Sequence, residues 1–184
     1  MTKYRLIHSF HKRYYTNHMQ LYFKGEVSPN YLDRNFNQRG WVTDVTYLSW
    51  GNNRAYLSTI IDLETRNIVS YHISSRNDVE LVLTTLNHAF DNKNDLNGLI
   101  LHSDQGSAYL STEYQTLCSN KGILISMSAK GSPLDNAVIE SFHASLKKET
   151  LYTHDINNLK HYIVLVKQWL ENYNHNRIRL LKKK

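Results

Sequence analysis

The chain has 184 residues, of which 22 are Lys or Arg and 16 are Asp or Glu, so its formal net charge is +6. This length is sufficient for one domain with a buried core. No apolar run approaches the roughly 20 residues of a membrane-spanning helix, and the N-terminus lacks the apolar stretch of a secretory signal. The single cysteine, Cys118, excludes an intrachain disulfide. We therefore expect a soluble globular protein without a membrane segment.

Three segments in the first half of the chain predict β-strands: 41–50, 54–63 and 68–74. They are rich in β-branched and aromatic residues, and the first alternates between apolar and polar positions. Gly51 and the two asparagines after it are a turn signal. Because connections this short join neighbouring antiparallel strands, we expect the three segments to form a meander.

Helices and strands alternate after this meander. The predicted helices are 78–92, 111–122, 136–152 and 155–174, and the predicted strands are 97–104 and 123–128. Apolar residues recur at helical spacing in the helices. Asn77 or Asp78 caps the first helix, Ser111 or Thr112 caps the second, and Gly122 ends the second. The order predicts an α/β fold, in which helices flank a mixed five-stranded sheet.

Charge is distributed unevenly along the chain. Residues 1–40 contain seven Lys or Arg and two Asp or Glu, residues 41–146 contain six and eleven, and residues 147–184 contain nine and three. An acidic centre between basic flanks fits a metal site whose neighbouring segments meet a polyanion. The alternative is that the basic ends are solvated tails.

Three acidic residues, Asp44, Asp104 and Glu140, occupy three different predicted elements. Asp44 lies in the middle of a strand, where Asp is disfavoured. Asp104 follows an apolar strand, and ligand sites in α/β sheets gather at such strand ends. Glu140 lies about one turn into a helix. Carboxylates gathered from separate elements can bind hard divalent cations, and two such ions can activate a nucleophile and stabilise a leaving oxygen at phosphorus.

Each of these acids also has a simpler interpretation. Asp44 could lie on a solvated strand face, Asp104 could be a turn or N-cap residue, and Glu140 could be an exposed helix residue. Two further acids compete for the site. Asp62, at the end of the second strand, could face the site or solvent, and Asp135 is explained more simply as the N-cap of the long helix.

Four sequence blocks carry a resemblance to a known family. They are, in chain order, WVTDVTY, IIDLETRNIVSY, HSDQGSAY and SAKGSPLDNAVIESFHASLKKE. Over about residues 27–175 the chain resembles the catalytic core of DDE insertion-sequence transposases, which contain a retroviral-integrase-like domain. The resemblance implies a ribonuclease-H-like fold. It also implies that Asp44, Asp104 and Glu140 bind two Mg²⁺ or Mn²⁺ ions, that water cleaves DNA at a transposon 3′ end, and that the freed hydroxyl then attacks a second phosphodiester.

The resemblance implies further site residues and partners. The residues expected to contact DNA or to line the site are His102, Gln105, Tyr109, Asn136 and Lys147. Lys147 continues the helix stripe of Asn136 and Glu140 and would contact a phosphate, although an exposed helix lysine is the alternative. The expected partners are transposon ends and target DNA, with a homo-oligomer assembled on DNA, no membrane, and a cytoplasmic, nucleoid-associated location.

The resemblance also sets the expected organisation. Residues 1–40 are a basic segment and linker, residues 41–175 are the core, and residues 176–184 are a basic tail. Relatives carry helix-turn-helix segments before the core and a longer tail, so a truncated copy is expected. Two alternatives to strand transfer remain. One is an inactive remnant that only binds DNA, and the other is a ribonuclease-H-type nuclease acting on RNA–DNA hybrids.

Overall fold

The computed structural model describes residues 27–91 and 95–176. The predicted basic segment before residue 27 and the tail from residue 177 lie outside the described residues, so both stay predictions.

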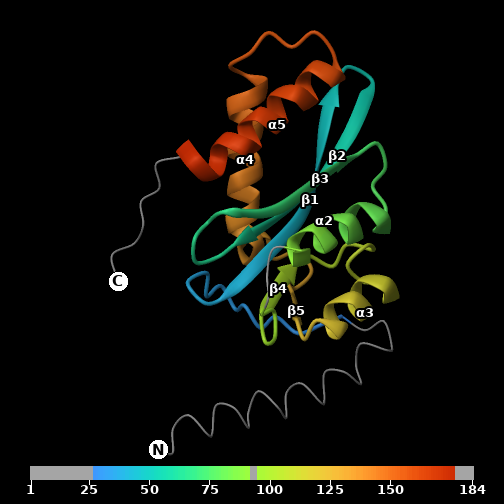
Figure 1. Ribbon diagram of the computed structural model, residues 1–184, viewed down its shortest axis with the longest axis vertical. Coiled ribbons are helices and arrows are strands. Elements are labelled where there is room, and N and C mark those ends of the chain that lie inside the picture. The colour runs from blue at the N-terminus through green and yellow to red at the C-terminus, as the bar shows by residue number, and fades with distance from the viewer. Residues whose placement is uncertain (1–26, 92–94, 177–184) are drawn as a thin grey trace, which may run out of the picture.

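A mixed five-stranded sheet forms the centre of the protein, in the order β3-β2-β1-β4-β5 (Figure 1). The strands are β1 (Gly40–Trp50), β2 (Asn53–Asp62), β3 (Ile68–Ser74), β4 (Ile100–Ser103) and β5 (Leu124–Met127). β1, β2 and β3 pair antiparallel, whereas β4 runs parallel to both β1 and β5. The predicted meander and the two further strands are confirmed, and β1 occupies the middle of the sheet.

Helices cover both faces of this sheet. They are α2 (Val79–Asp91), α3 (Thr112–Asn120), the 3₁₀ turn η1 (Pro133–Asn136), α4 (Ala137–Leu151) and α5 (Leu159–Asn176). Figure 1 shows α4 and α5 on one side of the strands and α2 and α3 on the other. Among the helices of the described residues, none combines the length and the apolar character needed to cross a membrane.

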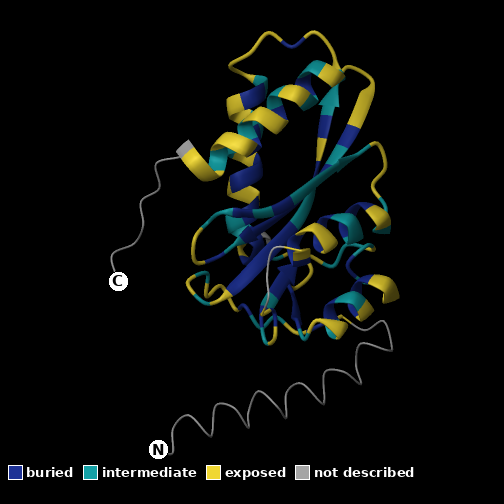
Figure 2. Ribbon diagram, in the orientation of Figure 1, coloured by how far each residue is buried: buried dark blue, intermediate teal, exposed yellow. Residues whose placement is uncertain are grey.

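Two hydrophobic cores result, one on each face of the sheet. Neighbouring residues of β1 alternate between them, because side chains along a strand point to opposite faces. Trp41 packs with the α2 and α3 residues, and Val42 packs with those of α4 and α5. Cys118 is fully buried in the first core, as expected of a packing residue, and burial raises the pKa of its thiol. Figure 2 shows buried residues along the strands and exposed residues on the outer helix surfaces.

Side-chain capping decides several helix ends. Asp78 Oδ1 accepts from the Leu81 backbone N–H at 3.1 Å, and Ser111 Oγ accepts from that of Tyr114 at 3.3 Å. These two residues, rather than Asn77 and Thr112, are therefore the caps. The helix predicted from residue 155 begins only at Leu159, because Asn158 Oδ1 accepts from the backbone N–H three residues later.

The segment before β1, residues 27–39, packs against β5. The backbone N–H groups of Tyr31 and Leu32 donate to Ser126 Oγ at 2.9 and 3.1 Å, and that of Met127 donates to the Pro29 carbonyl at 3.3 Å. Leu32 is fully buried in the core beneath α4 and α5. The part of the predicted linker that the structure describes thus belongs to the folded body, although the domain boundaries stay a prediction.

Asp135 does not cap α4, so that prediction is wrong. It lies in η1, where its carboxylate accepts from Arg34 Nε at 2.6 Å and from Asn30 Nδ2 at 3.0 Å. The N-cap position belongs to Asn136, which makes no side-chain capping bond. The 3₁₀ turn directs Asp135 toward the segment before β1, and its side chain is only 7% exposed.

Asp62 serves the turn after β2. Its Oδ1 accepts from the backbone N–H groups of Glu64 and Thr65 at 3.0 and 2.8 Å, and from the Thr65 hydroxyl at 3.0 Å. Of the two alternatives for Asp62, the structure therefore favours the solvent-facing one, since these contacts are exposed and Asp62 does not line the candidate site.

Candidate active site

A cavity of about 520 Å³ opens where β1, the segments after β4 and β5, and the start of α4 meet. Its lining residues are Asp44, Asp104, Gln105, Gly106, Ser128, Ala129, Lys130, Gly131, Ser132, Asn136 and Glu140. The fold thus brings the three carboxylates singled out in the sequence to one cavity, although they come from three elements.

Asp44 is half-buried on the face of β1 that α4 covers. Its Oδ1 accepts from the Val45 backbone N–H at 2.8 Å. Its Oδ2 lies 3.4 Å from His143 Nδ1. The side chain keeps 24% exposure, so one side of the carboxylate is held by the protein while the remainder can still meet a ligand.

Asp104 follows directly after β4, at the carboxyl end of the strand. Its Oδ1 accepts from the Gly106 backbone N–H at 2.8 Å, which turns the chain away from the sheet. Desolvation raises the pKa of Asp104, the Gly106 N–H opposes this increase, and the charge of Asp44 adds to it. The two carboxylates therefore repel each other, and a bound cation would relieve this repulsion.

Glu140 reaches the cavity because α4 docks on the sheet. Ile139, Phe142 and Leu146 are buried and hold one face of α4 against the core. Glu140 lies in the first turn of the same helix and its side chain is exposed. The helix thus places an exposed carboxylate at the same cavity as Asp44 and Asp104, whose side chains accept from backbone N–H groups.

The donor chemistry of this cavity fits a hard divalent cation, because its three carboxylates supply only oxygen ligands. Within residues 27–91 and 95–176, however, no three His, Cys, Asp or Glu residues lie close enough to form a ligand set. A complete set therefore requires at least one side chain to move inward, and exposed Glu140 has the freedom to change rotamer.

Gln105 and Asn136, both expected at the site, do line the cavity. Gln105 Nε2 donates to the Ser128 carbonyl at 3.0 Å and so ties the segment after β4 to the segment after β5. Asn136 is buried, and its Oδ1 has no hydrogen-bond partner among the described residues. An unsatisfied buried acceptor at a cavity wall is available to a ligand or to water.

His102 does not line the cavity, contrary to the expectation. It is fully buried on β4, with Nδ1 2.8 Å from Ser126 Oγ. Burial lowers the pKa of His102 to about 4, against the opposing charge of Asp135. The same Ser126 hydroxyl accepts from Tyr31 and Leu32, so the segment before β1 meets β5 at the residue that also contacts His102.

Tyr109 and Lys147 also lie outside the cavity wall. Tyr109 is 3% exposed in the core of the opposite sheet face, with its hydroxyl 3.5 Å from Thr43 Oγ1. Lys147 follows Glu140 by two helical turns, and its Nζ lies 4.1 Å from the centre of the Tyr47 ring. Partial burial lowers the pKa of Lys147, whereas Asp44 raises it, so this lysine remains within electrostatic reach of the cavity.

His143 is a site residue that the sequence interpretation missed. It contacts Asp44 from α4, three residues after Glu140. Residues at this spacing lie on the same face of a helix. The spacing Glu140–His143 was therefore the available signal.

Gly106 is expected to tolerate no side chain without loss of function. A Cβ at this position would lie 2.9 Å from Asp104 Oδ1 and 3.4 Å from Tyr109 Cδ2. Gly106→Ala should displace the Asp104 carboxylate and weaken the binding of a divalent cation in the cavity by roughly tenfold to a hundredfold, as is typical when a group that orients a metal ligand is disturbed. Thermal unfolding measures the effect on stability, and titration with Mn²⁺ measures the effect on the site. Ser107→Ala, at the exposed neighbouring position, is the control, and wild-type Mn²⁺ affinity in Gly106→Ala would contradict the steric argument.

The sheet order and the cavity at its carboxyl ends define the class of protein. A three-strand antiparallel meander followed by two parallel strands, with helices on both faces, is the ribonuclease-H-like fold of integrase catalytic cores. The family model "Integrase core domain" matches residues 37–133, and a second model of the same description matches residues 121–178. The chain belongs to the integrase core domain family.

Its relatives include transposases of insertion sequences. InsK of Escherichia coli (strain K12), a protein of insertion sequence element IS150, is 39% identical over 160 residues, which are 85% of this chain and 56% of InsK. The transposase of insertion sequence element IS904 from Lactococcus lactis is 38% identical over 127 residues, covering 67% of this chain and 50% of the relative. The chain spans about half the length of the curated relatives it matches.

Solved structures of retroviral integrases share the fold. The dimeric form of the HTLV-2 integrase catalytic core domain in complex with magnesium superposes with a TM-score of 0.57 at 17% identity, over 86% of this chain and 94% of the other. The BIV integrase catalytic core domain gives a TM-score of 0.58 at 19% identity, over 77% and 87%.

Proposed function

We propose that this chain carries the catalytic core of an insertion-sequence transposase, which cleaves DNA at a 3′ end and joins that end to a second phosphodiester. The carrying observation is that Asp44, Asp104 and Glu140, from three separate elements of an integrase core domain, line one cavity.

In this proposal the three carboxylates hold Mg²⁺ or Mn²⁺, with two ions expected. The bound cations would activate water or a 3′-hydroxyl and stabilise the leaving oxygen. Asp44 and Asp104 form the fixed part of the site, since backbone N–H groups orient both. Glu140 would turn inward from α4, and Asn136 would offer its unpaired carbonyl oxygen at the cavity wall.

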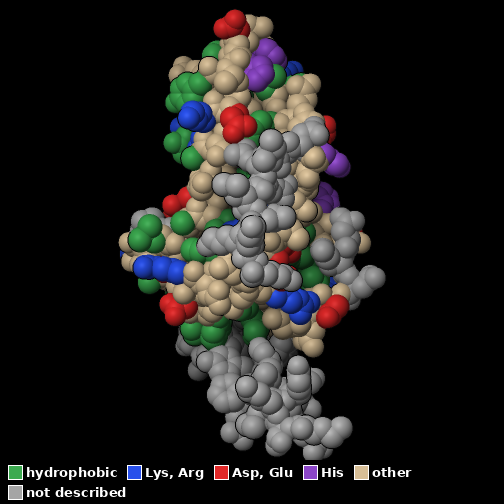
Figure 3. All heavy atoms as spheres, turned by 90° about the vertical axis from the view of Figure 1, so that its left-hand side faces the viewer, with side chains coloured by type: hydrophobic (Ala, Val, Ile, Leu, Met, Phe, Trp, Pro, Cys, Tyr) green, Lys and Arg blue, Asp and Glu red, His purple; other side chains and the backbone are tan. Residues whose placement is uncertain are grey.

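DNA is the proposed substrate, and the charge distribution says which parts of the chain would attract it. Residues 1–26, 92–94 and 177–184 contain half of the 22 Lys and Arg residues but only one acid, Glu26. The face seen in Figure 3 carries acidic, basic and histidine side chains interspersed among neutral ones. Phosphate attraction should therefore come mainly from the basic ends, with Lys147 contributing next to the cavity. We further propose a homo-oligomer on DNA.

A DNA-binding protein without catalytic activity is the second candidate. It is favoured by the absence, among the described residues, of three potential ligands close enough to hold a metal. In this case the basic ends would still bind DNA.

The wild-type chain should nick supercoiled plasmid and join a 3′-hydroxyl oligonucleotide to it in Mn²⁺ or Mg²⁺, and both products should vanish with EDTA. Fluorescence anisotropy at increasing KCl should show affinity for duplex DNA falling steeply with salt, because phosphate contacts release counterions. Salt-sensitive binding with no product in either metal would support the second candidate. Cleavage confined to an RNA–DNA hybrid would instead identify a ribonuclease.

A further inference from the structure

His143 is a buried polar residue for which the proposed chemistry has no use so far. Its side chain is 7% exposed, and its Nδ1 lies 3.4 Å from Asp44 Oδ2. This separation exceeds the roughly 2.7–3.2 Å of a direct N–H to O hydrogen bond, so a small rotation of either side chain would complete one.

The other ring nitrogen of His143 supports an orienting role. His143 Nε2 is buried and has no hydrogen-bond partner among the described residues. A buried polar atom without a partner destabilises the folded state. On one side the ring packs against Phe142, at 5.4 Å between centroids. Because Nε2 has no partner in the part of the chain that the structure describes, the approach of Nδ1 to Asp44 is the polar contact that the structure records for this imidazole.

The two oxygens of Asp44 are approached from two sides. The Val45 backbone N–H holds Oδ1 at 2.8 Å, and His143 approaches Oδ2. The backbone contact belongs to β1, whereas the imidazole belongs to α4. The same helix carries Glu140, three residues earlier. A single helix would therefore supply one proposed ligand and support another.

We propose that His143 is a positioning residue, which donates from Nδ1 to Asp44 and fixes the orientation in which that carboxylate binds a divalent cation. The inference rests on the proposed function and extends it to a residue that does not touch the cation. Side chains that orient metal ligands typically contribute tenfold to a hundredfold to metal affinity.

Two substitutions distinguish the effect of the imidazole's N–H donor from the effect of the space that its ring fills. His143→Asn places an amide N–H near the position of Nδ1, whereas His143→Leu fills similar space without a donor. Mn²⁺ affinity, measured by titration with electron paramagnetic resonance in the absence of DNA, should fall tenfold to a hundredfold in His143→Leu. It should stay within about threefold of wild type in His143→Asn. The Leu variant should unfold at the same or a higher temperature in EDTA, because it removes the unpaired Nε2.

Thr150→Val is the matched control, since Thr150 is another buried polar residue of α4 and its hydroxyl donates to the Leu146 carbonyl at 2.6 Å. This variant should bind Mn²⁺ like wild type. Wild-type affinity in His143→Leu, or equal losses in the Leu and Asn variants, would overturn the positioning role. Asp44→Asn tests separately the proposed function on which this inference rests. If wild type binds no Mn²⁺, or if Asp44→Asn binds it equally well, the proposed function and this inference both fail.

Discussion

Asp104→Asn should lower DNA nicking and joining by roughly a hundredfold to a thousandfold, the loss typical when one group that stabilises charge in a transition state is removed. The amide keeps the shape of the side chain and can still accept from the Gly106 N–H. It removes the negative charge that a divalent cation requires. Plasmid nicking in Mg²⁺ and in Mn²⁺ measures the loss, and Asp44→Asn and Glu140→Gln should behave alike.

The stability of Asp104→Asn should change in the opposite direction from its activity. Desolvation first, and the charge of Asp44 further, raise the pKa of Asp104 in the folded protein. Its ionised form is therefore less favourable in the folded than in the unfolded chain, and it lowers stability at neutral pH. In EDTA at pH 7 the Asn variant should unfold at the same temperature as wild type or higher. This advantage should shrink as the pH falls through the raised pKa of Asp104 in the folded protein, and it should be gone below about 4, where Asp is protonated in the unfolded chain as well.

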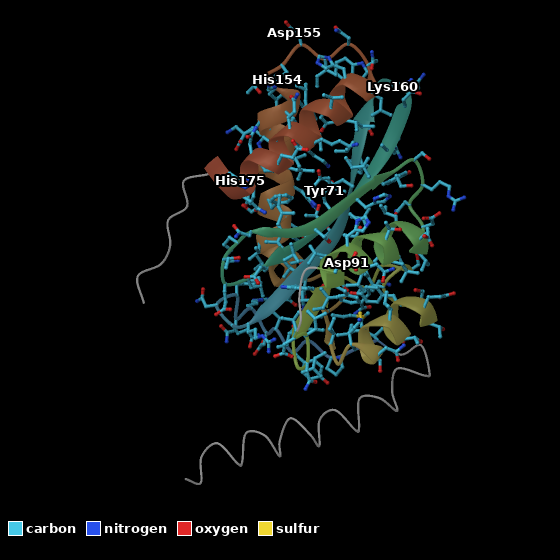
Figure 4. All side chains as sticks on the ribbon, in the orientation of Figure 1. Tyr71, Asp91, His154, Asp155, Lys160 and His175 are labelled. Carbon is cyan, nitrogen blue, oxygen red and sulfur yellow. The ribbon has the colours of Figure 1, made fainter. Side chains whose placement is uncertain are left out.

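Asp155→Asn is the control for this substitution. Asp155 is labelled in the loop between α4 and α5 at the top of Figure 4, whereas β4 and β5 lie in the lower part of the same view. The control should retain wild-type activity. Undiminished nicking by Asp104→Asn in both metals would exclude Asp104 from catalysis, and a large loss of stability would show that it is a structural residue.

Arg34→Met should destabilise the protein by about 2–3 kcal/mol, because it leaves the buried carboxylate of Asp135 without its cationic partner. Removing one partner of a buried ion pair costs about 3–5 kcal/mol, and the 55% exposure of the Arg34 side chain reduces that figure through solvent screening. Asn30 would remain as a partner of the Asp135 carboxylate. Urea denaturation followed by circular dichroism measures the change.

A double substitution identifies the cause of this loss. Arg34→Met combined with Asp135→Asn should recover most of the stability, since no buried charge is then left unpaired. Arg76→Met is the matched control. The Arg76–Asp78 pair is equally short, at 2.6 Å, but its side chains are 75% and 32% exposed, so the substitution should cost much less stability than Arg34→Met. Equal costs for Arg34→Met and Arg76→Met would refute the role of burial.

This ion pair also bears on the candidate site. Asp135 directly precedes Asn136, which lines the cavity, and the start of the helix that carries Glu140. Arg34→Met should therefore lower nicking activity under conditions in which the variant is still folded. The segment before β1 would thus contribute to the geometry of the site, although it contains none of the three carboxylates.

The local pattern of the sequence was sufficient for the elements of the fold. Alternation in the segment 41–50 and helical spacing in 78–92 depend only on residues near in sequence, so β1 and α2 fell within two residues of their predicted limits. The three carboxylates could be chosen for the same reason, since Asp44, Asp104 and Glu140 stand in recognisable sequence blocks. That all three line one cavity agrees with this choice, and their roles as ligands stay a prediction.

Only the tertiary structure decided how polar residues are partnered across the chain. Asp135 contacts Arg34 over 101 positions, and Ser126 contacts Leu32 over 94. Because of the first contact, Asp135 forms a buried ion pair instead of the expected helix cap. His102 shares the Ser126 hydroxyl with the second contact, and it is buried although a site-lining residue was expected. The contact between His143 and Asp44 likewise depends on how α4 packs against β1. Periodicity shows which face of an element is apolar, but the partner of a buried charge is set by how the elements pack, because any one of several distant groups could satisfy it.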